Sequence, residues 1–573
     1  MNNVDIARVF SEIADILEIK GRNEFRIRSY RQAEQTLFDL TVPVEEMLEN
    51  GEDITSLPGI GDSHAKKIKE LVKTGRCSRL EELREDFPKE LTVLMKVPGL
   101  GAKKVALLHR ELGIKNLKEL EKAAREKRIQ NLEGMGAKSE EKILKGVATL
   151  KTTAGRISIK EASDKFKELD KYLSDIEEIQ VKQVAGSLRR SKDTIGDLDV
   201  LIITEDRKEA IKRIREYPQI EEISAEGEEK LFVKLTGGME VDFRFFEKKS
   251  FGAALMYFTG SKAHNVELRK LAQAAGWKLN EYGVFDGKKK LAGEKEREVY
   301  NKLGMDWVPP ELRENRGEIA AAKNGKLPTL IEVGDIRGDL HVHTTASDGS
   351  ATIEEMTAAA IERGYQYLAI TDHSQAVRVT QGLDEEGLAE HVQNVRAVDG
   401  KHDNIRVLAG VEVDILKDGR LDLSTDILGE LDWVIASIHS YFNLEKKEMT
   451  KRLITAIESG AVNCLGHPLG RLLGTRDAVD FDVNKVFDAC LKNEVILEIN
   501  AHPQRLDLPD TYCKLAKDKG IKMVISSDAH KTRSLDLIGF GVGVARRGWL
   551  DKDDVINTLE AKELIRKVSK VSD

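Results

Sequence analysis

Cysteine is scarce in this 573-residue chain, which has four, Cys77, Cys464, Cys490 and Cys513, and no C-x-x-C pair. Thiols this few and scattered exclude a disulfide framework and fit a reducing compartment. Long apolar runs are also absent: no stretch approaches the ~20 apolar residues that span a bilayer, and no basic start precedes an apolar run at the N-terminus. We therefore expect a soluble, cytoplasmic protein that does not associate with membranes.

Positive charge is not in excess either. The formal net charge of −8 argues against nucleic acid as a partner, because phosphate neutralisation requires Lys and Arg. The charge is unevenly distributed, however: residues 1–150 contain 27 basic and 26 acidic residues, whereas the remaining 423 contain 64 and 73. Binding of nucleic acid must therefore rely on local basic patches and backbone N–H donors.

Three glycine-containing turns form an internal repeat in residues 1–150: LPGIG at 57–61, VPGLG at 97–101 and LEGMG at 132–136. Glycine permits a tight turn whose outward N–H groups hold phosphate oxygens without reading sequence. A single G-x-G is also typical of a helix C-cap, but two P-G-x-G copies favour DNA binding. The third copy lacks Pro, and a structural role is its alternative. The predicted DNA contacts are Gly59, Gly61, Gly99, Gly101, Lys66 and Lys103.

Three carboxylates in residues 151–248 are spaced for a shared metal site. Strand-like runs lie at 199–204, 230–235 and 239–246, with a helical stretch near 206–215. Asp197 and Asp199 are two apart on one strand and face the same side, and Asp242 comes from another strand. Two divalent ions on such a set activate an attacking hydroxyl and neutralise a triphosphate. An isolated D-x-D is usually a solvated strand edge, but G-S-L-R-R at 186–190 precedes this one, so the stretch predicts nucleotidyl transfer.

The second half alternates short apolar runs with helical stretches, which predicts parallel strands joined by crossover helices. In such a β/α barrel the carboxyl ends of the strands converge on one face. We expect about seven units, because the strand-like runs are GDLHVH (338–343), YLAITDH (367–373), VLAGVEV (407–413), DWVIASIH (432–439), VNCLGH (462–467), VILEIN (495–500) and KMVISSDAH (522–530).

Metal-binding side chains gather at the ends of these runs. A single H-x-H is often structural, but hydrogen-bonded core histidines do not explain six imidazoles and three carboxylates at successive strand ends, because buried charges must be paired or coordinated. Mixed imidazole and carboxylate ligands suit Zn²⁺, Mn²⁺ or Fe, and nine ligands imply two or three ions. Phosphoester hydrolysis is the predicted reaction class. The predicted ligands are His341, His343, Asp348, His373, Glu412, His439, His467, Asp528 and His530.

Two segments, VAGSLRRSKDTIGDLDVLII (184–203) and YFTGSKAHNVELR (257–269), resemble X-family DNA polymerases such as DNA polymerase beta. The resemblance implies that Asp197, Asp199 and Asp242 hold two Mg²⁺ or Mn²⁺ ions. Lys262 departs from the acidic residue of DNA polymerase beta, which puts base contacts there in doubt. A packed aromatic corner explains only part of the second segment. The implied contacts are Gly186, Ser187, Arg190 and Gly196 around the triphosphate, Tyr257, Phe258 and Gly260 at the sugar, and Asn265 and Arg269 on the minor-groove side.

The glycine turns resemble helix-hairpin-helix elements, which implies Na⁺ or K⁺ at the turns that bind DNA. The first repeat, LPGIGDSHAKKIKELVKTG, is close to the lyase domain of DNA polymerase beta. Lys67 aligns with its Schiff-base lysine, and Tyr30 and Arg26 fall near its phosphate-handling positions. A DNA-contacting lysine on an exposed helix is the alternative for Lys66 and Lys67, because a nucleophilic lysine needs a lowered pKa.

Residues from about 335 to 573 resemble the PHP (polymerase and histidinol phosphatase) domain through HVHTTASDGS, TDHS, GVEVD, IHS, GHP and SSDAH. Many members have His where this chain has Asp348, a departure that favours a harder ion such as Mn²⁺. The resemblance implies one ion on His341, His343, Glu412 and Asp528, a second on His439 and His467 bridged by Glu412, and a third on Asp348, His373 and His530.

These features predict a multidomain α+β and α/β protein: a helical helix-hairpin-helix N-terminal region, a nucleotidyltransferase palm and a C-terminal distorted (β/α)7 barrel. The combination is similar to the bacterial and archaeal X-family polymerases that carry a PHP domain. The expected domains are 1–80 (helical, DNA-binding or lyase-like), 81–150 (second helix-hairpin-helix), 151–248 (palm), 249–315 (nucleotide selection), 316–336 (linker) and 337–573 (PHP barrel).

The implied function is gap filling in DNA base excision repair, combined with Mn²⁺- or Zn²⁺-dependent 3′→5′ exonuclease activity. AP endonuclease and 5′-deoxyribose-phosphate lyase are further implied activities. The expected partners are gapped or nicked double-stranded DNA and dNTPs, and we expect a monomer. Two alternatives stay open: a barrel that hydrolyses a small phosphate monoester, as histidinol phosphatases do, and a DNA-end scaffold with inactive sites.

Overall fold

The computed structural model describes residues 3–21, 24–39, 44–49, 51–57, 59–87, 89–97, 100–132, 134–153, 156–376 and 382–568. The chain forms two compact units, Met1–Ala154 with Gly474–Arg476, and Gly155–Leu473 with Asp477–Asp573. Within the described residues, no helix is long and apolar enough to cross a membrane.

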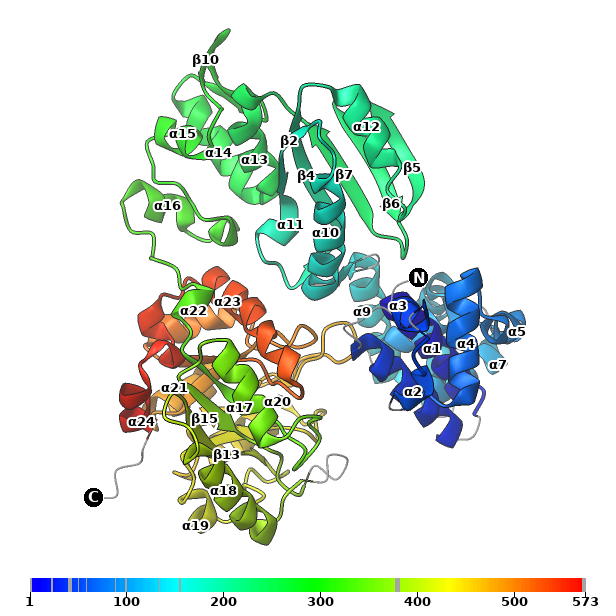
Figure 1. Cartoon of the computed structure of the whole chain (residues 1–573), viewed down its shortest axis with the longest axis vertical. Coiled ribbons are helices and arrows are strands. Elements are labelled where there is room, and N and C mark those ends of the chain that lie inside the picture. The colour runs from blue at the N-terminus through cyan, green and yellow to red at the C-terminus, as the bar shows by residue number, and fades with distance from the viewer. Residues whose placement is uncertain are drawn as a thin grey trace. The chain divides into compact units, whose positions relative to one another are not determined.

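The first unit is helical (Figure 1) and has two apolar clusters. One cluster combines α1 and α2 with α4 and α5, and the other gathers residues 91–147. Both arise because each helix has an apolar face that must be covered. The helices are α1 (Asn3–Ile19), α2 (Glu24–Asp39), α3 (Val44–Glu49), α4 (Asp62–Thr74), α5 (Ser78–Asp86), α6 (Lys89–Val93), α7 (Ala102–Leu112), α8 (Leu117–Arg125) and α9 (Ala137–Thr153), with short 3₁₀ turns at Ile54–Ser56, Leu94–Lys96 and Ile129–Asn131.

The second unit begins with a five-stranded sheet in the order β2-β4-β7-β6-β5. Strands β4 and β7 are parallel and the other neighbours are antiparallel. The predicted strands are therefore present, with β2 and β5 added at the edges. The elements are β1 (Ile157–Ser158), α10 (Ile159–Ser174), β2 (Ile179–Val184), α11 (Gly186–Arg189), β3 (Thr194–Ile195), β4 (Asp197–Thr204), α12 (Arg207–Arg215), β5 (Ile220–Gly227), β6 (Lys230–Leu235) and β7 (Glu240–Phe245).

A small helical region with a three-stranded sheet follows in the chain and has its own apolar core. Part of the segment predicted as a linker belongs to this region. Its helix α16 carries Glu318, whose buried carboxylate bonds the Nδ1 of His264 on α14 at 2.7 Å. The elements are α13 (Phe251–Thr259), α14 (Lys262–Ala274), β8 (Lys278–Asn280), β9 (Gly283–Asp286), β10 (Lys289–Ala292), α15 (Glu296–Lys302) and α16 (Glu318–Lys323), with 3₁₀ turns at Lys248–Ser250, Pro310–Leu312 and Val333–Asp335.

The rest of the second unit is a nearly closed barrel of seven parallel strands in sequence order, which confirms the predicted (β/α)7 class. A parallel bridge between Val342 and Ala529 joins its first and last strands. The strands are β11 (Gly338–Val342), β12 (Tyr367–Ile370), β13 (Arg406–Asp414), β14 (Trp433–Ser437), β15 (Cys464–Leu465), β16 (Ile496–Asn500) and β17 (Met523–Ser526).

Helices of the barrel region surround these strands (Figure 1). They are α17 (Ile353–Glu362), α18 (Glu385–Asp399), α19 (Thr425–Leu428), α20 (Lys446–Ile457), α21 (Val483–Lys492), α22 (Asp510–Lys519), α23 (Ile538–Arg547) and α24 (Ala561–Val568), with 3₁₀ turns at Thr532–Leu537, Lys552–Asp554 and Ile556–Thr558.

Alternation along the strands assigns polar and apolar side chains to the two faces of the barrel wall. On β13 the odd-numbered residues Val407–Val413 belong to the large cluster that the helices cover. Leu408 belongs to a second cluster with residues from each of the other six strands, on the opposite face. Because side chains repeat every two residues, Glu412 and Asp414 share the face of Leu408, near the carboxyl end of the strand. The strand pattern thereby places Glu412 and Asp414 at the carboxyl-terminal end of the apolar cluster that contains Leu408.

Candidate active sites

Three aspartates meet on the five-stranded sheet. Asp199 on β4 is in register with Asp242 on β7, and Asp197 lies two residues earlier on β4. Burial, followed by the charges of Asp197 and Asp242, raises the pKa of Asp199 to about 7. Carboxylates crowded in this way are stabilised in their ionised form by a bound cation. The donor set therefore fits divalent metal ions.

Gly186 opens α11 directly beside this aspartate cluster. Its φ is +61°, and a Cβ atom built there would lie 2.0 Å from a carboxylate oxygen of Asp199. Glycine is therefore required both by the backbone conformation and by the close approach. Gly196, just before Asp197, is also crowded, because its Cβ would lie 3.0 Å from the Nη1 of Arg156. The predicted Gly-Ser turn and the predicted aspartates thus form one site.

Arg190 joins this turn to the end of α13. Its Nη1 donates to the carbonyl oxygen of Thr259, and its Nε bonds Glu314 at 3.0 Å. Gly260 leaves room for this guanidinium, since a Cβ there would lie 3.1 Å from the Nη1 of Arg190. The segments predicted to contact the triphosphate and the sugar therefore touch.

The aromatic pair of the second predicted segment lies on α13. The rings of Tyr257 and Phe258 meet edge to face, with centroids 5.3 Å apart. Asn265 on α14 donates to the carbonyl oxygen of Tyr257 at 2.6 Å and is buried, so its side chain supports α13. Ser187 and Arg269 are partly exposed on α11 and α14.

In the barrel, Glu412 is the centre of the predicted ligand set. This carboxylate is 1% exposed, and five imidazoles approach its oxygens. Burial alone would raise its pKa, but the charges of His439, His373 and His341 lower it well below the ordinary value. The imidazole-to-carboxylate distances are 2.9 Å for His373, 2.9 Å for His467, 3.4 Å for His439, 3.5 Å for His341 and 3.6 Å for His343.

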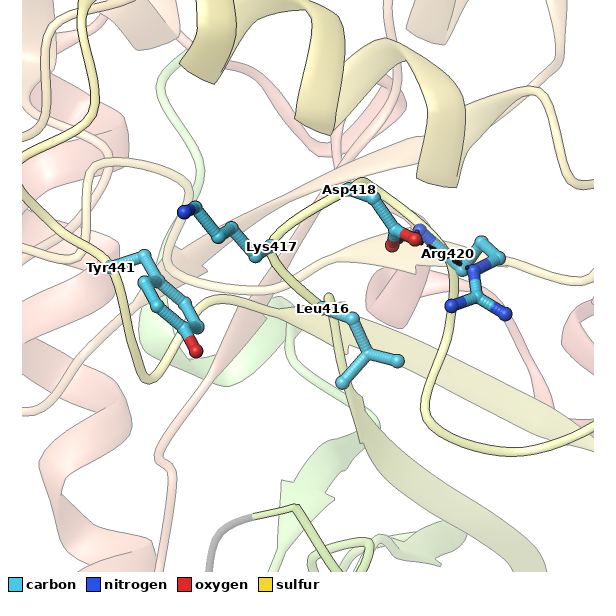
Figure 2. Close-up of a pocket in the computed structure, with 5 residues that line it drawn as sticks. All are labelled: Leu416, Lys417, Asp418, Arg420 and Tyr441. Carbon is cyan, nitrogen blue, oxygen red and sulfur yellow. Dashed lines mark hydrogen bonds and ion pairs between the residues drawn. The ribbon is translucent and has the colours of Figure 1, made fainter.

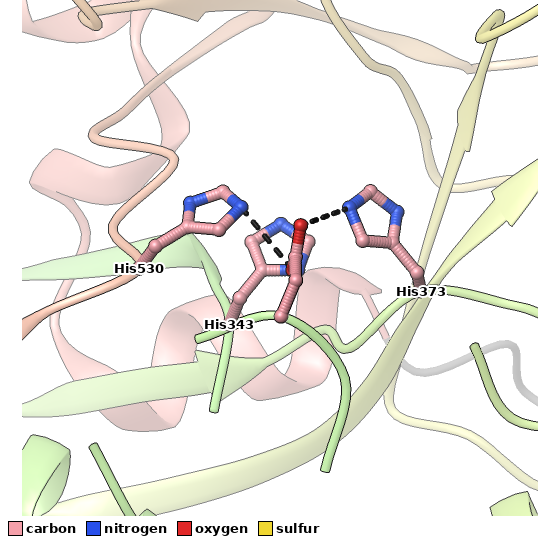
Figure 3. A group of neighbouring side chains, drawn as sticks. His343, His373 and His530 are labelled. Carbon is pink, nitrogen blue, oxygen red and sulfur yellow. Dashed lines mark ion pairs between the residues drawn. The ribbon is translucent and has the colours of Figure 1, made fainter. Parts of the chain in front are cut away.

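The predicted ligands fall into three overlapping groups whose donor atoms lie within 4.8 Å of one another. Figure 3 shows the imidazoles of His343, His373 and His530 side by side. Their ring nitrogens lie 3.8, 3.6 and 3.3 Å, respectively, from the carboxylate of Asp348. His343 and His373 each belong to two groups, which the predicted division among three ions did not include. His467 contacts Glu412 outside these groups. The groups are His343, Asp348, His373 and His530; His341, His343 and Asp528; and His373, Glu412 and His439.

The state of the imidazoles also fits metal binding. Buried ring nitrogens of His341, His343 and His439 lack a hydrogen-bond partner among the residues that the structure describes. Burial, followed by the charges of His530 and His373, lowers the pKa of His343 to about 4, so this ligand is neutral at ordinary pH. Metal ligation requires the neutral imidazole. The barrel site is therefore suited to divalent cations.

Sequence reasoning missed the buried groups that orient these ligands. Glu498 accepts from His341 Nδ1 at 2.6 Å and from the backbone N–H of His467 at 2.7 Å. Asp414 contacts His439 Nδ1 at 3.1 Å, and Asn500 donates to Asp528 at 3.1 Å. Such partners fix the ring orientation of ligating histidines. The available signal was the period of two, because Asp414 follows Glu412 and Asn500 follows Glu498 on one strand face.

In the first unit, the described glycines of the repeated turns lie just before helices. Gly59 has φ +71°, and a Cβ there would collide with Gln32, whereas Gly61 and Gly101 directly precede α4 and α7. Gly99 lies outside the described residues. Lys66 and Lys103 are exposed near the same helix starts.

Lys67 is half-buried on α4, unlike its exposed neighbour Lys66. Its Nζ lies 5.7 Å from the ring centroid of Tyr30 and donates to Ser63 Oγ at 2.9 Å. Burial, followed by nearby charges that include Arg79 and Arg26, lowers the pKa of Lys67. The pKa of Lys67 is therefore shifted in the direction that a nucleophilic lysine needs.

Four family profiles match the chain. A helix-hairpin-helix domain matches residues 1–77, and a SAM-like helix-hairpin-helix tandem matches residues 91–149. The DNA polymerase beta thumb matches residues 254–314, and the PHP domain matches residues 339–502. The profiles agree with the families that the sequence motifs resemble.

Curated relatives extend this likeness to the whole chain. The "DNA polymerase/3'-5' exonuclease PolX" of Bacillus subtilis is 39% identical over 571 residues, which cover 98% of this chain and 99% of that protein. A "probable phosphatase" of Photobacterium profundum is 34% identical over 28% of this chain and 63% of its own length. Another, from a Thermoanaerobacter species, is 30% identical over 38% of this chain and 89% of its own length. Because the first match spans both proteins almost completely, the chain belongs to the PolX family of DNA polymerase/3′-5′ exonucleases.

Proposed function

We infer that the chain is a DNA polymerase and a 3′→5′ exonuclease, with the two activities in separate sites of the second unit. The observation that carries the inference is the near full-length match to the PolX relative. The aspartate cluster on the five-stranded sheet and the His/Asp/Glu cluster in the barrel support it. The proposed substrates are gapped or nicked DNA and dNTPs.

In the polymerase site, Asp197, Asp199 and Asp242 would hold two Mg²⁺ or Mn²⁺ ions, which activate the 3′-hydroxyl and neutralise the triphosphate. Ser187 and Arg190 would bind the triphosphate oxygens from the turn at Gly186. The Tyr257–Phe258 corner would lie against the sugar. The roles of these residues rest on the aspartate register and on the contact of Arg190 with Thr259.

In the barrel, the nine ligands would hold up to three Mn²⁺ or Zn²⁺ ions, which lower the pKa of a bound water and stabilise phosphoryl charge. Glu412 would hold the surrounding imidazoles in fixed relative positions, and Glu498 would orient His341. We propose that the substrate is the 3′ end of DNA, with cleavage at abasic sites as a second reaction. The alternative is a small phosphate monoester, which the likeness to probable phosphatases favours. Comparing turnover of a 3′-recessed duplex with that of histidinol phosphate separates the two.

Separate sites predict separable losses. Asp242→Asn should lower nucleotide incorporation about 100-fold or more while nuclease activity persists, since even outer-shell partners of a metal are worth about 10–100-fold. The double change His341→Ala with His343→Ala should do the reverse. Both are measured with one labelled gapped duplex, dNTPs and Mg²⁺ or Mn²⁺, with extension and degradation resolved on one gel.

Glu222→Gln, at an exposed carboxylate on β5 of the same sheet, and His402→Ala, outside the ligand set, serve as controls. If both active-site variants lost both activities while circular dichroism showed them folded, the assignment to separate sites would be wrong.

Lyase activity is a second candidate function, favoured by the lowered pKa of Lys67. Its Nζ would attack C1′ of a 5′-deoxyribose phosphate and form an imine with loss of water, and β-elimination would then release the phosphate-bearing strand. Borohydride should therefore trap a covalent protein–DNA adduct. We expect Lys67→Ala to abolish the adduct and Lys66→Ala to retain it; equal trapping in both would refute the assignment.

A further inference from the structure

An open pocket lies in the loops that follow β13 and β14 (Figure 2). Its volume is about 590 Å³, within the range of ~300–1,000 Å³ that is typical of small-ligand sites. The loops stand at the carboxyl ends of the strands, the end from which the metal ligands project. The lining residues are Leu416, Lys417, Asp418, Arg420 and Tyr441.

An aromatic ring with adjacent cations distinguishes this pocket. Tyr441 is 55% exposed, an unusual state for a large ring. The Nζ of Lys417 lies 5.5 Å from the ring centroid of Tyr441, and the guanidinium carbon of Arg452 lies 5.9 Å from it. Arg420 pairs with Asp418 at 2.8 Å, so the three ionised side chains of the lining carry one net positive charge.

The buried arginine beneath the ring fixes both loops. Arg452 is 1% exposed, and its guanidinium donates to the carbonyl oxygens of Leu416 and Ser440, each at 2.9 Å, and to that of Ile415. Gly419, at φ +94°, packs so closely on α20 that a Cβ would lie 2.6 Å from the Cβ of Thr455. The exposed ring therefore stands on a preorganised support.

The loop that carries Tyr441 starts at a residue of the predicted metal centre. His439 precedes Tyr441 by two residues, and its Nε2 lies 3.4 Å from Glu412. Two residues span at most ~7 Å. The Cα atom of Tyr441 therefore lies within ~7 Å of that of His439, so the loop that carries the ring begins beside the metal centre.

We propose that Tyr441 is a stacking platform for an unpaired base at the DNA 3′ end, with Lys417 and Arg420 along its phosphate backbone. This proposal rests on the exonuclease function. Every base has a π-face, so the platform accepts any sequence, as an exonuclease requires, and cations beside the ring track the phosphates. The pocket thereby favours single-stranded ends over paired ones.

The test compares two oligonucleotides that differ only at the 3′-terminal nucleotide, one with a base and one abasic. Tyr441→Asn removes the ring, and Asn tolerates the positive φ of +54° at this position better than Ala does. It should raise KM for the base-bearing end roughly five- to 150-fold, the span of base–aromatic stacking, with kcat nearly unchanged. The abasic end should show no such change, and Tyr441→Phe should restore wild-type KM. Lys417→Ala should reduce the slope of the logarithm of the binding constant against the logarithm of salt concentration by about one unit.

Tyr282→Asn, at an exposed tyrosine outside the barrel, is the matched control. Equal losses on both oligonucleotides, or a Phe variant as defective as Asn, would overturn the stacking site. Fluorescence anisotropy of the same oligonucleotides measures binding without turnover. If wild type bound the base-bearing end more tightly than Tyr441→Asn does but neither degraded it, only the nuclease assignment would be contradicted. If wild type and Tyr441→Asn bound that end equally well, the stacking platform would be contradicted.

Discussion

A methyl group at position 186 would collide with the Asp199 carboxylate. The 2.0 Å approach leaves no space for it, and φ of +61° adds a backbone cost of about 1–2 kcal/mol for a non-glycine residue. We expect Gly186→Ala to displace Asp199 and to lower nucleotide incorporation about 100-fold, the cost of misplacing a reacting group by ~1 Å. Single-nucleotide gap filling measures the loss.

The control is Gly276→Ala, because Gly276 has φ +80° and no neighbour within 4 Å of a built Cβ. It carries the backbone cost without the collision. If both variants incorporated nucleotides equally well, the close approach to Asp199 would have no catalytic meaning.

Glu498 is a buried partner of two ligand residues, so its charge should matter for metal affinity. Glu498→Gln keeps the shape but weakens the bond to His341 Nδ1, and we expect metal affinity to fall about 10–100-fold. Metal titration followed by calorimetry measures the change, and nuclease activity should recover at high metal concentration. Glu458→Gln, at an exposed carboxylate on the same domain, should leave affinity unaltered; an unchanged affinity in Glu498→Gln as well would contradict the orienting role.

The cluster of proposed ligands was predictable because its histidines and carboxylates lie at strand ends in a repeated pattern, and the structure brings them together. Glu498 and Asn500 lie two apart within VILEIN, which places them on one strand face, but this spacing does not say which imidazole or carboxylate they contact. Tyr441 was missed for a different cause. An exposed aromatic follows from tertiary packing, which one sequence does not contain.

At the scale of elements, α16 shows that a segment predicted as a linker is part of a folded core. Glu318 and His264 are both buried and joined by a 2.7 Å bond. Burial lowers the pKa of His264 from 6.5; burial would raise that of Glu318, but its bond to His264 outweighs this and lowers it. The linker prediction rested on the overall composition of residues 316–336, which does not reveal that Glu318 bonds His264 in the core.

These shifts predict acid sensitivity with a defined sign. Below pH 6.5 the unfolded chain protonates His264 while the folded protein still resists protonation, so folding stability falls as pH falls. Glu318 acts in the same sense below pH 4.5. Each proton contributes at most about 1.4 kcal/mol per pH unit.

We expect His264→Gln to reduce the drop in Tm between pH 7.5 and pH 5.5 relative to wild type, as followed by thermal unfolding. His402→Gln, at a partly exposed histidine, is the control and should keep the wild-type drop. An undiminished drop in His264→Gln would show that other groups govern the acid response.

Strand prediction succeeded where apolar runs are bounded by polar residues, as for β4, β6, β7 and the barrel strands. It gave little for β5, whose sequence IEEISAEG is mostly exposed, because pairing with β6 rather than burial defines that strand. The two-residue β15 lies inside the longer run VNCLGH (462–467) that was predicted as a strand.

At the scale of the whole molecule, the order of domains was predictable because each has a distinct periodicity: glycine turns between helices, then mixed strands, then repeated strand–helix units. Periodicity does not show which side chains of one element contact those of another. The contact of Arg190 with Thr259 and the three overlapping metal groups depend on rotamers that follow from packing.

Closure of the barrel has a consequence for the order in which the protein matures. Val342 pairs with Ala529, so His341 and His343 meet Asp528 only after nearly 190 residues have intervened. Contacts this distant along the chain form slowly, and metal binding is tied to the folded arrangement of its ligands. During synthesis on the ribosome the aspartates of the polymerase site can assemble first. The metal groups of the barrel would then form only after the last strand, β17, has been made.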